Sequence, residues 1–224
     1  MKLSELLRRF RVESGDKVEP YFNDNMDVIG WLNDAVNEAC LRGRLLHESQ
    51  DLDICNIVVT TGNSQYQLHS SLYELTYIWF QPDDGSRGLY LTLVSPESLD
   101  QHYVNENWRR LKGKPKFAVQ DDTRIRIVPS PEQDGVLQLE GYRIPIVEME
   151  NDDDEPEINK NHHIHLINWA MHKAFSVVDA EFFDPNRAAL TEQAFTEYFG
   201  PRPDSDLRRM TREDTPHLVQ PFFT

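Results

Sequence analysis

One short stretch of the chain combines cations with aromatic rings. The segment "WRRLKGKPKF", residues 108–117, begins with Trp108, ends with Phe117 and carries five cationic side chains, namely Arg109, Arg110, Lys112, Lys114 and Lys116. Basic side chains next to stacking rings are typical of grooves that bind single-stranded nucleic acid. The same cations would also suit acidic protein surface, in this subunit or in a neighbour. The residue types alone leave both interpretations open.

The charge of the whole chain separates these two interpretations. The 224 residues have a formal net charge of −15, and because the basic stretch contributes +5, the remaining residues carry −20. Proteins bind DNA mainly through Lys and Arg side chains that displace counterions from the phosphates, and so acidic surface repels DNA at long range. The composition therefore favours acidic protein as the partner of the basic stretch. Acidic surface elsewhere would let DNA pass without sticking.

The segment "NHHIHLINWAMHKAF" is the best candidate for a metal site. His162 and His165 are three residues apart, and His172 follows seven residues later, so one helical face would carry all three. Neutral imidazoles at such spacing can bind zinc or a similar ion. No carboxylate occupies the offset of a known motif such as HExxH. We therefore interpret the histidines as the polar entrance of a helix, and we expect no metal and no other cofactor.

The acidic run Glu148–Glu157 offers many oxygen atoms, as a calcium site would. It lacks the alternating acidic positions and the central glycine of a calcium-binding loop. A solvated linker is the simpler interpretation. Nucleophile motifs such as GxSxG, a local Cys–His signature and a glycine-rich phosphate loop are absent from the sequence. The sequence therefore gives no support for catalysis, and we expect a protein that is not an enzyme.

Other features of the sequence indicate the cellular compartment in which the protein is made. Cys40 and Cys55 have no metal-ligand spacing, and we interpret both as reduced, buried residues. No apolar run approaches the roughly 18 residues that a membrane-spanning helix needs. The segment "MKLSELLRRF" is amphipathic and lacks the core and cleavage site of a signal peptide, which predicts synthesis in the cytoplasm.

The hydrophobic pattern predicts helices at both ends of the chain. Residues 1–54 form a first helical part, with a short helix that stops near Gly15 and a second that starts near Asn25. The apolar face of the second helix comprises Val28, Leu32, Ala35, Val36, Ala39 and Leu46. Residues 161–200 form a second helical part, after an acidic linker at 148–160. Its first helix spans about 161–182 with a stripe of Ile167, Ala170, Met171, Ala174 and Val178, and its second begins at Asp184–Pro185, ends at Gly200 and turns Ala188, Phe195 and Tyr198 inward.

The middle of the chain, residues 55–147, changes to a period of two. Alternation in "TRIRIV" and "VLQLEGY" predicts two strands, which "PSPEQDG" would join into a hairpin. Ser95 and Pro96 predict the start of a short helix. Strands at short spacing indicate antiparallel sheets without parallel crossovers. The fold class expected is therefore α+β: a discontinuous helical bundle with an inserted antiparallel β domain. Residues 201–224 follow as an extended arm whose Leu218, Val219, Phe222 and Phe223 would be buried on another subunit or on a partner.

Several stretches in this order resemble the head-to-tail adaptor, or connector, proteins of tailed bacteriophages, the group that includes tail tubular protein A of short-tailed phages. They are "YFNDNMDVIGWLNDAVNEACLRGRLL" near the start, "VSPESLD", "NENW" and "GKPKFAVQDDTRIRIVPSPEQDGVLQL" in the middle, and "INWAMHKAFSVVDAEFFDPNRAALTEQAFTEYFG" near the end. Together they cover about residues 20–200.

The resemblance implies a structural virion protein without catalysis. Adaptors of this kind form a ring, commonly of twelve copies, beneath the portal protein. They extend the DNA channel without sequence-specific binding and carry the tail or nozzle protein. The alternative is another phage ring protein, such as a tail terminator or head-completion stopper. The resemblance also implies that the arm reaches a portal or neighbouring subunit, and the charge pattern suggests the basic stretch as an inter-subunit patch.

Overall fold

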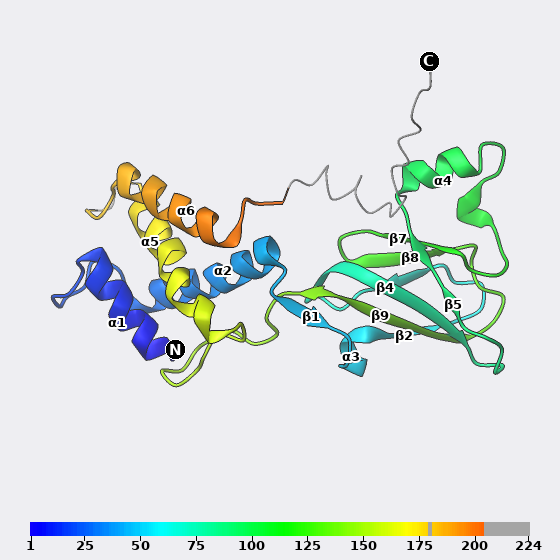
Figure 1. The fold of residues 1–224 in the computed structure, drawn as a ribbon, viewed down its shortest axis with the longest axis horizontal. Coiled ribbons are helices and arrows are strands. Elements are labelled where there is room, and N and C mark those ends of the chain that lie inside the picture. Colours follow the sequence, from blue (N-terminus) through cyan, green and yellow to red (C-terminus); the bar gives the residue numbers. More distant parts are fainter. Residues whose placement is uncertain (179–180, 204–224) are drawn as a thin grey trace, which may run out of the picture. The chain divides into compact units, whose positions relative to one another are not determined.

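A computed structural model of the chain describes residues 1–178 and 181–203 (Figure 1). The described residues form two compact units. The helical unit comprises Met1–His47 and Tyr142–Pro203, and the β unit comprises Glu48–Gly141. This mixture of helices and sheets confirms the α+β fold class. The arm residues Leu218, Val219, Phe222 and Phe223 lie outside the described residues.

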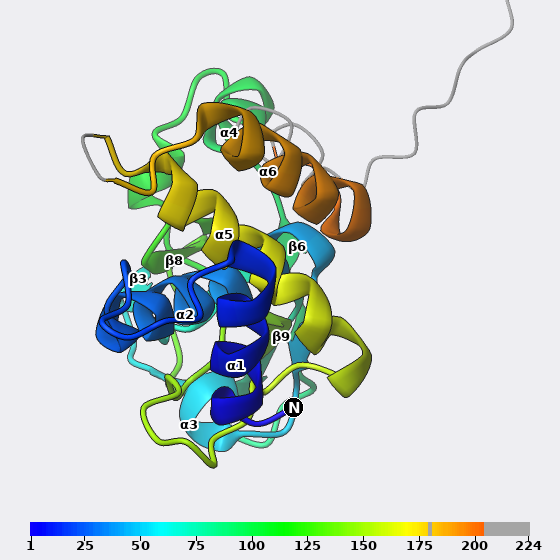
Figure 2. The ribbon, with the colours of Figure 1, turned by 90° about the vertical axis from the view of Figure 1, so that its left-hand side faces the viewer.

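Four α-helices build the helical unit: α1 (Leu3–Ser14), α2 (Asn25–Gly43), α5 (Leu166–Ser176) and α6 (Pro185–Phe199). The central one is α5, which contacts the other three (Figure 2). Its first turn follows a 3-10 helix, η2 (Lys160–His165). One hydrophobic core joins these helices, although they come from opposite ends of the sequence.

The predicted helix boundaries are mostly confirmed. Asp24 caps α2, and α1 ends at Gly15, whose φ of 90° is in the left-handed region that favours glycine. Asp184 caps α6, with Pro185 in its first turn and Gly200 at its end. The predicted core residues Val28, Leu32, Ala35, Val36, Ala39, Ile167, Ala170, Met171, Ala174, Ala188 and Phe195 are all buried.

Three details of the helix prediction are wrong. Helix α5 ends at Ser176, because the chain turns back so that Asp184 donates its backbone N–H to the carbonyl of Phe175 at 3.0 Å. Val178 is therefore 69% exposed and does not belong to the core stripe. Tyr198 is 41% exposed because it packs beside histidines at the surface. Leu46 lies in a strand, since α2 ends at Gly43.

The β unit is a sandwich of two sheets. The strands are β1 (Leu46–Glu48), β2 (Asn56–Val59), β3 (Gln65–Gln67), β4 (Leu72–Pro82), β5 (Leu89–Tyr90), β6 (Thr92–Leu93), β7 (Phe117–Gln120), β8 (Arg124–Val128) and β9 (Gly135–Arg143). One sheet has the order β1-β9-β4-β5, with β2 also paired to β9, and the other has the order β3-β8-β7-β6. Short helices α3 (Leu52–Cys55), α4 (Pro96–His102) and η1 (Trp108–Arg110) lie between strands. As predicted, Ser95 caps α4 and Pro96 begins it.

Side-chain alternation places the core of the sandwich correctly. Ile125 and Ile127 of β8 are buried, as are Leu137 and Leu139 of β9, and they meet in one hydrophobic cluster between the sheets. The predicted hairpin of β8 and β9 is nevertheless wrong. Strand β8 pairs with β3 and β7, whereas β9 pairs with β2 and β4 in the other sheet. Alternation tells which side chains face the core, but it does not tell which strand is the neighbour.

The expectation of purely antiparallel sheets also needs correction. Strands β6 and β7 are parallel, with Thr92 opposite Phe117 and Leu93 opposite Ala118. The connection between them contains α4 and η1, as a parallel pair requires a long crossover. Because β6 has only two residues, it leaves no periodic signal in the sequence.

Candidate functional site

The basic stretch begins with a buried aromatic residue. Trp108 is 4% exposed, and its indole Nε1 donates a hydrogen bond of 2.6 Å to the carboxylate of Asp100. Arg109 donates to the same carboxylate at 3.0 Å, and its guanidinium carbon lies 4.1 Å from the centre of the Trp108 ring. These two donors, Trp108 first, hold the pKa of Asp100 below its ordinary value. The Trp108 ring is therefore used inside the fold and offers no platform for a stacked base.

The lysines that follow form an ordered row on a fixed backbone. Lys112, Lys114 and Lys116 are exposed, and we call them the basic row. Gly113 and Pro115 alternate with them. Pro115 is buried, and the chain bends at Gly113 and Lys114, where Gly113 has a φ of +147°.

Backbone hydrogen bonds hold this segment against residues 128–130. Gly113 N–H donates to the Ser130 carbonyl at 3.0 Å, Ser130 N–H to Leu111 at 2.9 Å, and Lys116 N–H to Val128 at 2.9 Å. Of the five predicted cations, Arg109 thus has an internal partner. Arg110 and the basic row have no acidic partner among the described residues. The basic row thus offers three exposed positive charges to an anionic partner.

The predicted histidines lie along α6, with His162 and His165 at its end and His172 near its start. His165 stacks on Tyr198 with ring centroids 3.5 Å apart, and His162 Nδ1 lies 3.1 Å from the Tyr198 hydroxyl. His172 Nδ1 lies 3.0 Å from the carbonyl of Ala188. Burial, together with the neighbouring His162, lowers the pKa of His165. Within the described ranges, no group of three metal-ligating side chains is close enough to hold an ion.

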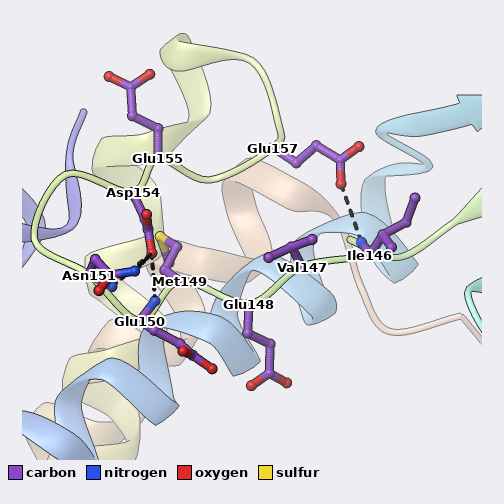
Figure 3. Close-up of a pocket in the computed structure, with 9 residues that line it drawn as sticks. All are labelled: Ile146, Val147, Glu148, Met149, Glu150, Asn151, Asp154, Glu155 and Glu157. Atoms are coloured by element: carbon purple, nitrogen blue, oxygen red, sulfur yellow. Dashed lines mark hydrogen bonds between the residues drawn. The ribbon is translucent and has the colours of Figure 1, made fainter.

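The acidic segment is an ordered part of the helical unit, and we call residues 146–157 the acidic loop (Figure 3). Its carbonyls cap α1, because Leu3 N–H donates to Asp154 at 2.7 Å and Ser4 N–H to Asp152 at 3.1 Å. The Asp154 carboxylate accepts hydrogen bonds from the N–H groups of Asn151 and Glu150, which lower its pKa. The segment expected to be a solvated linker thus organises the start of a helix.

Two residues anchor the acidic loop in the core. Met149 is 4% exposed, and Asn33 of α2 binds both of its backbone groups, each at 3.0 Å. Ile158, just beyond the loop, is also 4% exposed. Arg143 pairs with Glu157, whose other oxygen accepts from Ile146 N–H at 3.3 Å. Sequence reasoning missed this site, although two apolar residues within and beside an acidic run were the available signal.

A groove of about 590 Å³ lies along the acidic loop, lined by Ile146, Val147, Glu148, Met149, Glu150, Asn151, Asp154, Glu155 and Glu157 (Figure 3). Ile146 is 50% exposed and Val147 is 78% exposed. Glu148 and Glu150 are exposed on either side of the buried Met149. The groove therefore combines apolar surface with negative charge, and it would suit a partner with apolar and cationic groups.

A second exposed surface lies where two loops of the helical unit meet. Phe22 and Phe182 stack with ring centroids 5.5 Å apart, joining the α1–α2 loop to the α5–α6 loop. We call the exposed apolar side chains on and beside these loops the apolar end, and they are Val18, Tyr21, Phe22, Met26, Val177, Val178 and Phe183. Such a cluster is typical of surfaces that contact other proteins. None of the helices in the described part of the chain is both long and apolar enough to span a bilayer.

A family model described as "SU10 adaptor protein" matches residues 1–219 of the chain. A search of curated proteins finds no match.

Proposed function

The chain belongs to the SU10 adaptor protein family, and on that premise we propose that it forms a ring between the portal and the tail of a phage particle. Family membership gives it a structural adaptor role in a virion and contact with other head and tail components. This confirms the resemblance to head-to-tail adaptors. The observation that carries the proposal is the extent of the match, which includes both units and most of the arm.

In this proposal the ring, commonly of twelve copies in proteins that this chain resembles, extends the DNA channel. Twelve copies at −15 each would carry about −180, and surface of that sign facing the lumen would let the genome slide without adhesion. The exposed side chains of the apolar end support docking of the helical unit on other protein surface. The arm residues Leu218, Val219, Phe222 and Phe223 would be buried on the portal or on a neighbouring subunit.

The direct test is to mix the purified protein with the portal ring of the same phage and to measure the mass of the product by native mass spectrometry. We expect a discrete complex that contains several copies of the chain. A chain without residues 205–224 should fold, as judged by circular dichroism, but should fail to join the portal. Normal portal binding by this truncated chain would contradict the role of the arm.

The basic row gives a second test. We expect the variant K112E/K114E/K116E to weaken ring assembly while the monomer stays folded, because these side chains would face acidic protein surface. Fluorescence anisotropy with single-stranded DNA provides the opposing measurement. If the variant assembles normally but loses a measurable affinity for DNA, the basic row is a nucleic-acid site instead. The position of the protein in the particle would distinguish an adaptor from a terminator or stopper.

A further inference from the structure

The acidic loop presents two carboxylates in a fixed direction. Asn33 binds the N–H and the carbonyl of Met149, each at 3.0 Å, and the Met149 side chain is buried. Glu148 and Glu150, the residues on either side, therefore face solvent. Neither has a cationic partner within the described part of the chain, in contrast to Glu155 and Glu157, which pair with Lys160 and Arg143.

The basic row presents its cations in a matching way. Lys112, Lys114 and Lys116 occupy alternate positions of a segment that backbone hydrogen bonds fix at Gly113 and Lys116. Lys114 and Lys116 are exposed on either side of the buried Pro115, as Glu148 and Glu150 are on either side of the buried Met149, and so each segment offers a pair of like charges to solvent.

Apolar surface lies beside the acidic pair. Ile146 and Val147 are 50% and 78% exposed along the groove. Exposed ion pairs contribute little individually, because water screens them. A contact that also covers these two side chains would gain from apolar burial, while the charges would fix its register and speed the encounter.

We propose that the acidic loop of one copy binds the basic row of a second copy of this chain, with Glu148 and Glu150 facing the lysines and with Ile146 and Val147 covered. The inference rests on the proposed ring and names one contact in it. The acidic loop and the basic row carry opposite charges and belong to different units of the same chain. This charge complementarity identifies a second copy of the chain as the partner of each. Every copy carries one acidic loop and one basic row. The same head-to-tail contact therefore repeats from copy to copy until a ring closes.

Charge reversal tests this contact. The acid-reversed chain is E148K/E150K, and the base-reversed chain is K112E/K114E/K116E. Each alone would bring like charges together, and we expect at least a tenfold loss of assembly on the portal ring, measured by mass photometry. An equimolar mixture of the two should recover assembly, because alternating copies then restore opposite charges at every contact.

Matched controls change the same number of charges on exposed residues elsewhere. The chain D121K/D122K matches the acid-reversed chain, and R8E/R9E/R124E matches the base-reversed chain. We expect both controls to assemble as the wild type does. If the controls lost as much assembly as the acid-reversed and base-reversed chains, the change in net charge would be responsible. That result would overturn the inference.

The remaining outcomes are also decisive. If both reversed chains assemble normally on the portal, the inference is wrong and the proposed ring stands. If only a chain that carries both reversals recovers, and the mixture does not, the contact lies within one chain. If the wild type forms no assembly with the portal, the proposed function and the inference both fail.

Cross-linking gives an independent measurement of the contact. One chain carries Glu148→Cys and another carries Lys114→Cys, and a short bis-maleimide is added to the mixture on the portal. The native Cys40 and Cys55 are buried, which limits their reaction. We expect a covalent dimer of the two different chains, and little product when either chain is used alone. An equal yield from one chain alone would contradict the pairing.

Discussion

The helical unit buries charged side chains, whereas the β unit, in the described part of the chain, buries only neutral polar ones. Arg11, Asp16, Glu38 and Arg143 are all less than 9% exposed in the helical unit. The buried polar residues of the β unit are Ser71, Gln120 and Ser130. The two units differ because their backbones are satisfied in different ways.

Loops explain the charges of the helical unit. The α1–α2 loop has no strand beside it, and so its backbone groups need other partners. Asp16 accepts hydrogen bonds from the N–H groups of Phe22 and Asn23 and pairs with Arg11, which also donates to the Asn23 carbonyl at 2.7 Å. A second network joins Glu38 of α2 to Arg42 and to Arg202, beyond α6. Charged groups suit this task because each makes several strong hydrogen bonds.

In the β unit, neighbouring strands satisfy most backbone groups through hydrogen bonds, and the strands and sheets are closely packed. Gln120 of β7 connects the two sheets, since its side chain accepts from Leu75 N–H and donates to the Tyr73 carbonyl, each at 3.1 Å. Strand β9 passes so near β4 that a Cβ on Gly141 would lie 2.4 Å from the carbonyl oxygen of Glu74. The helical unit should therefore be sensitive to loss of single charges, and the β unit to added volume.

The largest effect is expected from Asp16→Ala. The change leaves the buried Arg11 without its acidic partner and removes the acceptor for two loop N–H groups, and so we expect a loss of about 3–5 kcal/mol in the free energy of unfolding. Urea denaturation followed by tryptophan fluorescence measures it. The exposed pair of Lys2 and Asp153 is the control, and Asp153→Ala should change the stability little. Equal losses in the two variants would remove the distinction between buried and exposed charge.

A smaller effect is expected from Gly141→Ala. The new methyl group would meet the backbone of β4, and we expect a loss of about 1–3 kcal/mol. Gly30 provides the matched control, because it is exposed in α2 and an added Cβ meets nothing within 4 Å. Gly30→Ala should stabilise the chain by up to about 1 kcal/mol. Thermal unfolding measures both, and stabilisation by Gly141→Ala would contradict the close packing of β9 on β4.

The smallest effect is expected on the melting temperature at acid pH. Burial alone would raise the pKa of Glu38, but hydrogen bonds from Arg202 and Arg42 outweigh it and hold the pKa below the ordinary value of 4.5. The folded state thus favours the carboxylate, and its contribution is present above pH 4.5 and is lost as the pH falls through the lowered pKa. We expect Glu38→Gln to flatten the fall of the melting temperature below pH 4.5. A slope equal to that of the wild type would show that Glu38 is not involved.

The basic row could be recognised from the sequence, whereas the acidic loop was interpreted as a linker, and the difference has a physical reason. Lys112, Lys114 and Lys116 are exposed, as charged residues usually are, and their type alone identifies a cationic surface. The acidic loop had the composition of a linker. Met149 became an anchor only because Asn33 is placed beside it, 116 residues earlier in the chain. Composition does not report such a contact.

Local chemistry determined the helices, their caps and the inward faces of the strands. Asp184, Pro185 and Gly200 act on their own neighbours, and so the sequence was sufficient to assign them. The family could also be inferred from the order of short motifs. Only the tertiary structure decided which strands pair, where α5 ends and how the acidic loop is held. These depend on contacts between residues far apart in the chain, and no local pattern records the partner.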